Sequence, residues 1–422
     1  YLYYLLRNPQ LEETYLVHME EVIRYFDTHM EEREELQFIF SELGKIGKFS
    51  IYDYLDYLDD LGERSNRKHY LALLLMLISI GIMVVNFSVG ILALLAVVIY
   101  NNVTYFGMKK EIEPYITSFA YIFRLLNIYP EFKKHRAECL GEEFEEMELA
   151  FRQMDRFQRG SGIVMSGTRA GGSGSPLDML MDFFRMGFHI DLIKFNQMLG
   201  EVRRHLDAVD TFLTHYGYIE SCIAIGEYRA YLGDFCVPSF HEERRIRMVD
   251  GYHPMLTDPV RNTFETGKGM LITGSNASGK STFLKTVAIN ALLAQSIHTC
   301  LAAEFETCFF RICSSMSLKD DVLHGESYYM VEIKSIKRIL DLIAHKEYRV
   351  LCFVDEVLRG TNTVERIAAS SQILKSLNSE NSMCFVATHD IELTSLLEDR
   401  YENYHFREEV TNGDVTFSYQ LL

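Results

Sequence analysis

The chain has 422 residues, 48% of them hydrophobic, and a formal net charge of −17 from 42 Lys and Arg against 59 Asp and Glu. This length leaves room for two or three domains with sizeable cores. The acidic balance argues against a surface built throughout for nucleic acid, which requires basic patches. The eight cysteines show no CxxC spacing, which is typical of a reducing compartment and indicates no cysteine-based metal site.

We expect two stretches, residues 1–69 and 107–235, to be helical. Apolar residues recur at helical spacing over 3–26, and the pattern returns as long amphipathic helices over 177–235. The Gly- and Ser-rich stretch 160–176 predicts a flexible loop between helices. Periodicity alone does not identify a family, so an arbitrary helical domain stays an open alternative here.

Residues 70–100 carry no charged side chain and are rich in Leu, Ile, Val and Ala. One straight helix of this length would span about 46 Å, more than the roughly 30 Å hydrocarbon core of a bilayer. The polar residues near Asn86 and Ser88 favour a break into two arms of about 16 residues each. The sequence therefore predicts a transmembrane or re-entrant helical hairpin over 70–106.

Both flanks of this hairpin are basic: Arg64, Arg67 and Lys68 precede it, and Lys109 and Lys110 follow it. Because Lys and Arg favour the cytoplasmic side of a membrane, both ends are expected there. This predicts a protein at the cytoplasmic face of the cell membrane. The alternatives are a hairpin buried in a large helical bundle and a seam between copies of an oligomer.

The stretch 274–281 fits the phosphate-binding pattern GxxxxGK[ST], between a short apolar strand at 270–273 and a helix over about 281–295. Its glycines let successive N–H groups turn toward a triphosphate, Lys280 places a charge at the β and γ groups, and Ser281 offers a hydroxyl to Mg²⁺. ATP and Mg²⁺ are therefore the expected cofactors. The loop residues predicted to bind the nucleotide are Gly274, Asn276, Ser278, Gly279, Lys280, Ser281 and Thr282.

Two later apolar runs end in residues suited to phosphate chemistry. Run 350–354 is typical of a strand buried on both faces and leads into Asp355 and Glu356. Asp355 is predicted to hold Mg²⁺, and Glu356 to polarise the attacking water. Run 383–387 leads to His389, which is predicted to sense the γ-phosphate. The predicted catalytic residues are Glu356, His389 and Lys280; a nucleotide-sensing scaffold that does not hydrolyse ATP is the non-enzymatic alternative.

Four stretches resemble the ATPase domain of the DNA mismatch repair MutS family: TGSNASGKST from Thr273, DDVLHGESYYMVEI from Asp320, DEVLRGTNT from Asp355 and ATHDIELT from Ala387. The resemblance implies an ABC-class P-loop ATPase domain with a mostly parallel sheet over 236–422. It also implies that two copies face each other, with Ser327 of one copy completing the ATP site of the other. Read without the family, Ser327 is a helix N-cap.

The resemblance extends to other parts of the chain. The Tyr-His-Pro at 252–254 is similar to the start of the family's ATPase domain, which makes His253 a nucleotide-binding candidate, and Asn262 matches an Asn that follows in that pattern. Segments 3–26 and 219–232 are similar to the family's core and lever helices. In this comparison the apolar hairpin takes the place of the arm that clamps DNA, and the mismatch-reading domain is not among these residues.

Short basic clusters at 133–136, 203–205 and 244–247 are expected to be solvated helix faces, because acidic residues border them. DNA binding is therefore supported by the resemblance more than by charge. We expect a membrane-tethered ATP switch of the MutS type, related to DNA mismatch repair, that binds DNA. The alternative is a membrane-anchored mechanochemical ATPase that acts on a protein partner or on the membrane without DNA.

Overall fold

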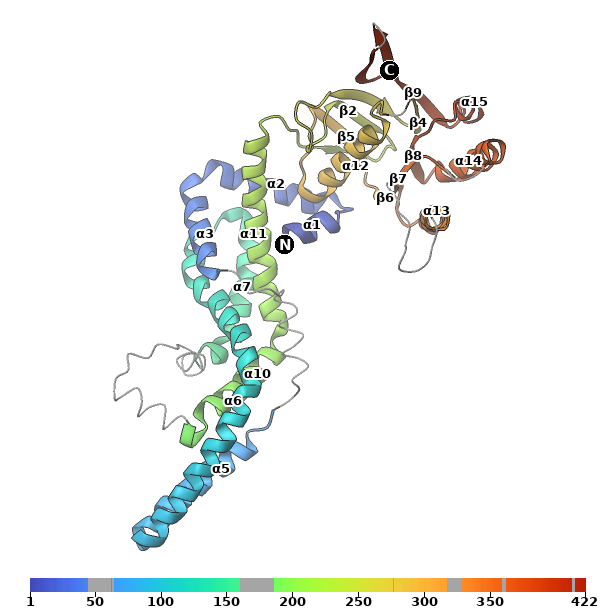
Figure 1. Cartoon of the computed structure of the whole chain (residues 1–422). Helices are drawn as coiled ribbons and strands as arrows, with labels where there is room; N and C mark the ends of the chain where they lie inside the picture. Colours follow the sequence, from blue (N-terminus) through green and yellow to red (C-terminus); the bar gives the residue numbers. More distant parts are fainter. Residues whose placement is uncertain are drawn as a thin grey trace. The chain divides into compact units, whose positions relative to one another are not determined.

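The computed structural model describes residues 1–44, 62, 64–159, 186–275, 277–316, 328–358, 362–411 and 414–422. Three of the predicted features lie outside these residues: Asn276, Ser327 and the loop 160–176. The chain divides into two compact units, one of residues 1–24 and 222–422 and one of residues 25–221. Helices α2 (Glu13–Thr28) and α11 (Leu206–Leu232) each continue from one unit into the other (Figure 1). The finer division into four domains stays a prediction.

A six-stranded sheet forms the centre of the first unit, in the order β10-β9-β4-β8-β7-β6. Its strands are β4 (Gly269–Thr273), β6 (Arg311–Ser315), β7 (Val350–Asp355), β8 (Ser382–Ala387), β9 (Tyr401–Thr411) and β10 (Asp414–Leu421). All of them run parallel to their neighbours except β10, which pairs antiparallel with β9. The strands predicted at 270–273, 350–354 and 383–387 are confirmed as β4, β7 and β8.

Helices cover both faces of this sheet, which explains why its central strands are apolar throughout. Helix α12 (Lys280–Ile297) packs with one set of alternating residues, such as Phe353 and Phe385. Helices α13 (Tyr328–His345) and α14 (Thr363–Leu377) pack with the other set, such as Val354 (Figure 1). A strand buried on both faces needs apolar side chains at every position. The short helix α15 (Glu392–Leu396) follows β8.

A second sheet, which the sequence analysis did not foresee, has the order β1-β5-β2-β3. Its strands are β1 (Ser239–Phe240), β2 (Ile246–Gly251), β3 (Asn262–Thr266) and β5 (Glu304–Thr307). The sheet is mixed, because β2 pairs antiparallel with β3 and β5 while β1 pairs parallel with β5. Arg245 and Arg247 lie at β2 and bind Glu306 at 2.7 and 2.9 Å. The prediction that cluster 244–247 forms a helix face is therefore wrong: it borders a strand and is paired with acidic side chains.

A buried ion pair joins the helices of this unit to the end of α12. The Arg229 guanidinium, on α11, donates to both Glu20 carboxylate oxygens, at 2.7 and 3.2 Å, and to the carbonyl of His298 at 2.8 Å. Burial opposes ionisation of Glu20, but contacts with His298 and Arg229 outweigh it and lower the Glu20 pKa to about 2. Arg229 also donates to Thr299. Helix α1 (Leu2–Arg7) packs against α12 in the same unit.

The second unit is helical, as predicted. Its elements besides the ends of α2 and α11 are α3 (Met30–Leu43), α5 (Arg67–Val85), α6 (Phe87–Phe132), the 3₁₀ turns η1 (Lys133–His135) and η2 (Glu138–Leu140), α7 (Gly141–Gln153) and α10 (Ile190–Arg204). Aromatic side chains fill its core, where Phe119 packs against Phe157 and Phe195, and Phe132 packs against Phe144 and Tyr216. The amphipathic pattern read from the sequence therefore corresponds to helices that bury one face.

Helices α5 and α6 form the expected hairpin with its break at Asn86. The Asn86 side chain accepts a hydrogen bond from the backbone N–H of Val89 at 3.2 Å and so caps α6. Gly90 lets the two helices touch, because a Cβ there would lie 2.0 Å from the Cα of Met83. The expected arm length of about 16 residues is wrong: α5 has 19 residues and the apolar part of α6, Phe87–Ile112, has 26.

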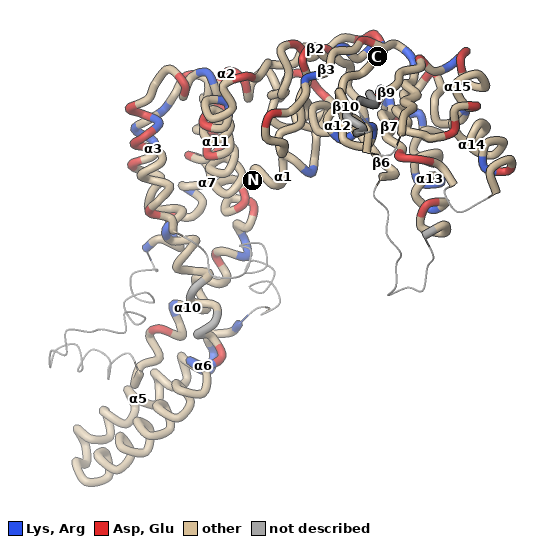
Figure 2. The backbone as a smooth tube through the Cα atoms, turned by 45° about the horizontal axis from the view of Figure 1, so that its top comes forward, with Lys and Arg blue, Asp and Glu red and all other residues tan. Residues whose placement is uncertain are grey.

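The apolar surface of the hairpin is exposed. Only 22% of the apolar window in α5 and 11% of that in α6 is buried within the chain. Figure 2 shows most of α5 and the part of α6 that pairs with it free of Lys, Arg, Asp and Glu. Within the described part of the chain, the hairpin is therefore not buried in the helical bundle, and its exposed surface has the character of one that lipid or a second copy would cover.

Polar side chains fix the base of the hairpin. His189, which precedes α10, places Nε2 at 2.9 Å from the carbonyl of Asn101 and Nδ1 at 3.1 Å from Nδ1 of His69. Beside it the Tyr105 hydroxyl donates to the Asp191 carboxylate at 3.0 Å. These buried contacts join α5, α6 and α10, so the hairpin and the helical unit share one polar anchor.

Candidate nucleotide-binding site

The phosphate loop connects β4 to α12, as the sequence predicts. Three of its described residues have a positive φ, in the left-handed half of conformational space: Gly274 (φ 147°), Ala277 (φ 64°) and Gly279 (φ 106°). A Cβ on Gly274 would meet Ser278 Oγ at 2.9 Å, and one on Gly279 would meet the Tyr419 ring at 3.1 Å. Glycine is therefore required at both positions by backbone conformation and by space.

The side chains of Lys280 and Ser278 point toward the inside of this loop. Lys280 Nζ donates to the carbonyls of Gly274 and Ser275, at 2.8 and 2.7 Å. The Ser278 hydroxyl is buried and accepts or donates no hydrogen bond within the described part of the chain. A buried hydroxyl and an ammonium group beside the N-terminus of an 18-residue helix fit a phosphate group.

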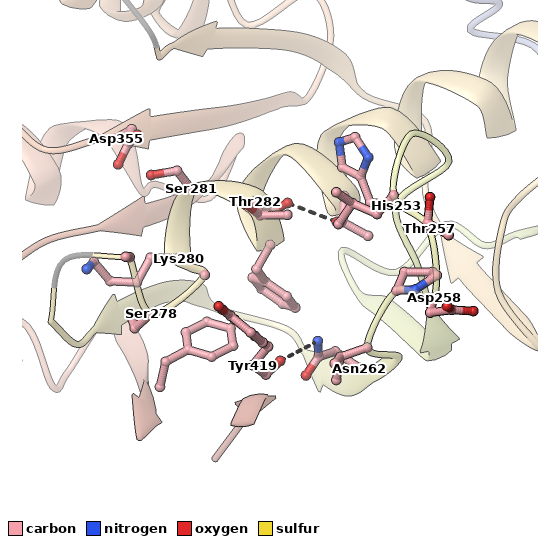
Figure 3. A pocket seen from close by; sticks show the side chains of 18 of the residues that line it. His253, Thr257, Asp258, Asn262, Ser278, Lys280, Ser281, Thr282, Asp355 and Tyr419 are labelled. Carbon is pink, nitrogen blue, oxygen red and sulfur yellow. Dashed lines mark hydrogen bonds between the residues drawn. The ribbon is translucent and has the colours of Figure 1, made fainter. Parts of the chain in front are cut away.

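The ends of the next two strands meet at this loop. Glu356, directly after β7, has a left-handed backbone (φ 60°), and its N–H donates to the carbonyl of Ala387 at 2.9 Å. His389 follows β8 and places Nε2 at 2.8 Å from Glu356 Oε1. Figure 3 shows the oxygen atoms of Asp355 and Ser281 turned toward one another. A carboxylate and a hydroxyl are hard oxygen ligands, which suit Mg²⁺.

One pocket, of about 590 Å³, contains these groups. Of the predicted residues it brings together His253, Ser278, Gly279, Lys280, Ser281, Thr282, Asp355, Glu356 and His389. Gly274 shapes the loop but does not line the pocket, and Asn276 and Ser327 lie outside the described residues. The roles of these residues stay predictions, but their common location is what a nucleotide site requires.

The side of the pocket away from the strand ends is formed by residues 253–262 and by the last two strands. His253 lines it, and burial lowers the pKa of its imidazole, which favours the neutral ring. Phe406 and Tyr419 add aromatic surface, and Asn262 holds Tyr419 in place by donating to its carbonyl at 3.2 Å (Figure 3). This apolar wall suits a nucleotide base.

Tyr419 is one of several pocket residues that the sequence did not reveal. The alternation of Val415, Phe417 and Tyr419 predicts a plain hairpin strand with all three on one face. The structure has a register shift between Phe417 and Leu421, and Tyr419 takes a left-handed backbone (φ 56°). The bulge turns the Tyr419 ring toward Gly279. The regular alternation of residue types gives no signal of this bulge.

A parallel sheet that delivers a glycine-rich loop and two polar strand ends to one pocket defines a P-loop nucleotide-binding domain. Comparison with known families is more specific, since the family model described as MutS domain V matches residues 270–422. Residues 270–422 therefore form a MutS-family domain. The resemblance read from the four sequence stretches is thereby confirmed.

Its relatives include several proteins named DNA mismatch repair protein MutS. That of Roseiflexus castenholzii is 34% identical over 208 residues, which cover 46% of this chain and 19% of the relative. That of Thermus thermophilus is 35% identical over 190 residues, or 44% of this chain and 23% of the relative. That of Bacillus licheniformis is 31% identical over 242 residues, or 53% of this chain and 25% of the relative. The chain thus matches no more than a quarter of the length of these relatives.

Proposed function

We propose that this chain binds and hydrolyses ATP as a membrane-tethered switch of the MutS type, related to DNA mismatch repair. The observation that carries the proposal is the single pocket in which the phosphate loop meets Asp355, Glu356 and His389. Bound Mg²⁺ would be held by Ser281 and Asp355 and would supply charge neutralisation at the phosphates. Lys280 binds the phosphates, and Ser278 donates to them from inside the loop.

Glu356 and His389 supply the chemistry in this proposal. The contact between His389 and Glu356 orients the carboxylate, and the fixed backbone at Glu356 holds it at the strand end. The carboxylate then polarises the attacking water and accepts its proton. His389, which follows β8, senses through a hydrogen bond whether the γ-phosphate is present. A scaffold that only senses nucleotide would not need a carboxylate at this position.

The active form is a pair of copies, with Ser327 of one completing the site of the other. We expect the Lys280→Ala protein to lose ATP binding and the Ser327→Ala protein to bind ATP but hydrolyse it slowly. Mixed together, the two variants form pairs with one intact site, which restores up to about a quarter of wild-type turnover. Phosphate release on titration of one variant into the other measures this. A mixture no more active than its components would show that each site is complete within one chain.

A second candidate is the same ATPase acting on a protein partner or on the membrane, without DNA. The observation that favours it is the pairing of the basic clusters: Lys133 binds Glu148 at 2.6 Å, Arg204 binds Glu201 at 2.7 Å, and Arg247 binds Glu306. Paired side chains of a chain with net charge −17 offer few free cations to phosphates.

Binding of fluorescent duplex, branched and single-stranded DNA decides between these candidates. If DNA is the ligand, the association constant measured with ATP falls steeply with salt, by roughly a thousandfold between about 50 and 200 mM, because counterions are released. Arg156→Ala, which removes a cation on an exposed helix face 4.0 Å from Glu201, serves as the control for a general charge effect. Absence of binding at about 50 mM salt would remove DNA and leave the second candidate.

A further inference from the structure

Two cysteines face each other across an antiparallel bridge in the first unit. The N–H of Cys236 donates to the carbonyl of Cys300 at 2.9 Å, and the N–H of Cys300 donates back to Cys236 at 2.8 Å. This reciprocal pattern places the two Cα atoms about 5.5 Å apart with both side chains on the same face. That separation is inside the range that disulfides bridge.

The two thiols differ in environment in a way that suits stepwise oxidation. Cys236 is partly exposed and Cys300 is buried. A hydrogen bond from the Cys300 thiol lowers the pKa of Cys236, whereas burial raises the pKa of Cys300. A partly exposed thiol with a lowered pKa beside a second, buried thiol is the arrangement of a cysteine and its resolving partner.

Other cysteines of this unit provide a contrast. Cys313, Cys352 and Cys384 lie in one row across β6, β7 and β8, as direct neighbours in the parallel ladder. Cys352 and Cys384 are fully buried, and burial raises the pKa of the Cys352 thiol well above its usual value. Cys313 is partly exposed, as Cys236 is, but burial raises the pKa of the Cys313 thiol to about 12, whereas the pKa of Cys236 is lowered. Proximity of cysteines is therefore not unusual in this sheet, but the bridge pair differs from the row in the state of its partly exposed thiol.

We propose that Cys236 and Cys300 form a reversible oxidation site at which a peroxide converts the two thiols into a disulfide. The Cys236 thiolate attacks one peroxide oxygen, the O–O bond breaks, and a sulfenic acid forms with release of hydroxide, which takes up a proton to become water. The Cys300 sulfur then attacks the sulfenic sulfur, the S–O bond breaks, and a second water leaves. The two thiols lose two electrons, and the peroxide gains them.

The geometry makes this bond easy to reduce. Side chains directly opposite in an antiparallel pair have Cβ atoms about 4.5–5.5 Å apart, whereas a relaxed disulfide brings them to about 3.5–4.5 Å. The bridge must therefore contract, and a strained disulfide is readily reduced by dithiols. The disulfide is then a reversible crosslink and not a permanent one.

A disulfide between Cys236 and Cys300 would link the segment that follows α11 to the segment that follows α12. Cys236 lies in the connection between α11 and β1, and Cys300 lies just after α12, the helix that begins at Lys280. Arg229 on α11 already contacts residues 298 and 299 at the same end of α12. A disulfide would fix this junction covalently, so that α11 and the end of the phosphate-loop helix cannot separate.

The test uses the whole detergent-purified chain, treated with hydrogen peroxide, alkylated, digested and analysed by mass spectrometry. We expect a peptide pair linked through Cys236 and Cys300, lighter by two hydrogens and restored by dithiothreitol, to form about tenfold faster than oxidation of the partly exposed Cys139. Cys300→Ala should instead accumulate sulfenic acid at Cys236 that dimedone traps. Cys384→Ala, the matched control in the buried row, should leave the linked pair unchanged.

Two results would overturn the proposal. One is oxidation of Cys236 to sulfinic acid while the Cys300 thiol stays free in the wild-type chain. The other is no faster loss of the Cys236 thiol than of the Cys139 thiol. Both readouts are masses, so they do not depend on whether the chain hydrolyses ATP.

Discussion

Replacing Glu356 with Gln is expected to slow ATP hydrolysis by roughly two to three orders of magnitude while leaving ATP binding intact, a loss of about 3–4 kcal/mol of transition-state stabilisation. Gln has the shape of Glu and keeps one carbonyl oxygen facing His389, which lies 2.8 Å away. It cannot accept a proton from the attacking water, so binding and chemistry separate. Steady-state phosphate release and equilibrium binding of a fluorescent ATP analogue measure the two effects.

Glu347→Gln is the matched control, since Glu347 is exposed and precedes the opposite end of the same strand, β7. It should leave both hydrolysis and binding at wild-type values. Equal hydrolysis by wild type and Glu356→Gln would mean that another group accepts the proton. Loss of ATP binding in Glu356→Gln would mean that the Glu356 carboxylate maintains the structure of the site and does not act in catalysis.

The centre of this site could be predicted from the sequence because its signals are local. A glycine-rich loop between a strand and a helix can adopt only a few backbone conformations. A strand buried on both faces is recognised as an unbroken apolar run, such as 350–354. The ends of β4, β7 and β8 then fall at one edge because parallel strands share a direction. Asp355 and His389 meet the loop for that reason.

What escaped prediction depends on pairing between distant segments. The strand at Ser239–Phe240 has two residues and exists through its pairing with β5, whose partner residues Glu306 and Thr307 lie far along the chain. The ring of Tyr419 reaches the phosphate loop through a bulge, which alternation of residue types does not show.

The hairpin was predicted in kind but not in length, for a similar reason. Asn86 marks the turn because its side chain caps α6. The ends were misplaced because polar residues such as Asn101 do not end a helix when they have partners, and its side chain donates to the backbone at residue 187. Helix α6 also continues past Lys109 and Lys110 as far as Phe132. Charge marks the edge of an apolar surface, not the end of a helix.

The wild-type chain is expected to stay with the membrane fraction through a salt wash and to be released by detergent. Helix α5, at 19 residues, is about 28 Å long, close to the roughly 30 Å hydrocarbon core of a bilayer. The uncharged part of α6 is of similar length, and both flanks are basic, which favours a hairpin whose two ends lie on the cytoplasmic side. We propose on this ground that the chain is anchored at that face.

Two arginine substitutions test the anchor. Leu77 lies near the middle of α5 and Leu95 lies within the apolar part of α6, and they are 62% and 54% exposed. Leu77→Arg with Leu95→Arg should weaken insertion by about 5–7 kcal/mol, since Arg at a helix centre costs about 2.5–3.5 kcal/mol in a bilayer. The double variant should then move to the salt-washed supernatant. Centrifugation of membranes followed by quantitative immunoblotting measures the distribution.

Leu149→Arg is the control, because Leu149 on α7 is 61% exposed but lies outside the apolar hairpin. It should stay with the membrane fraction like the wild type, which separates the effect of a charge in the hairpin from the effect of a charge on any exposed leucine. A wild-type chain found entirely in the supernatant would contradict the anchor. If that soluble chain were also a dimer that Leu77→Arg dissociates, the apolar surface would be a seam between two copies, since burial against a partner relieves the same exposed area that lipid would.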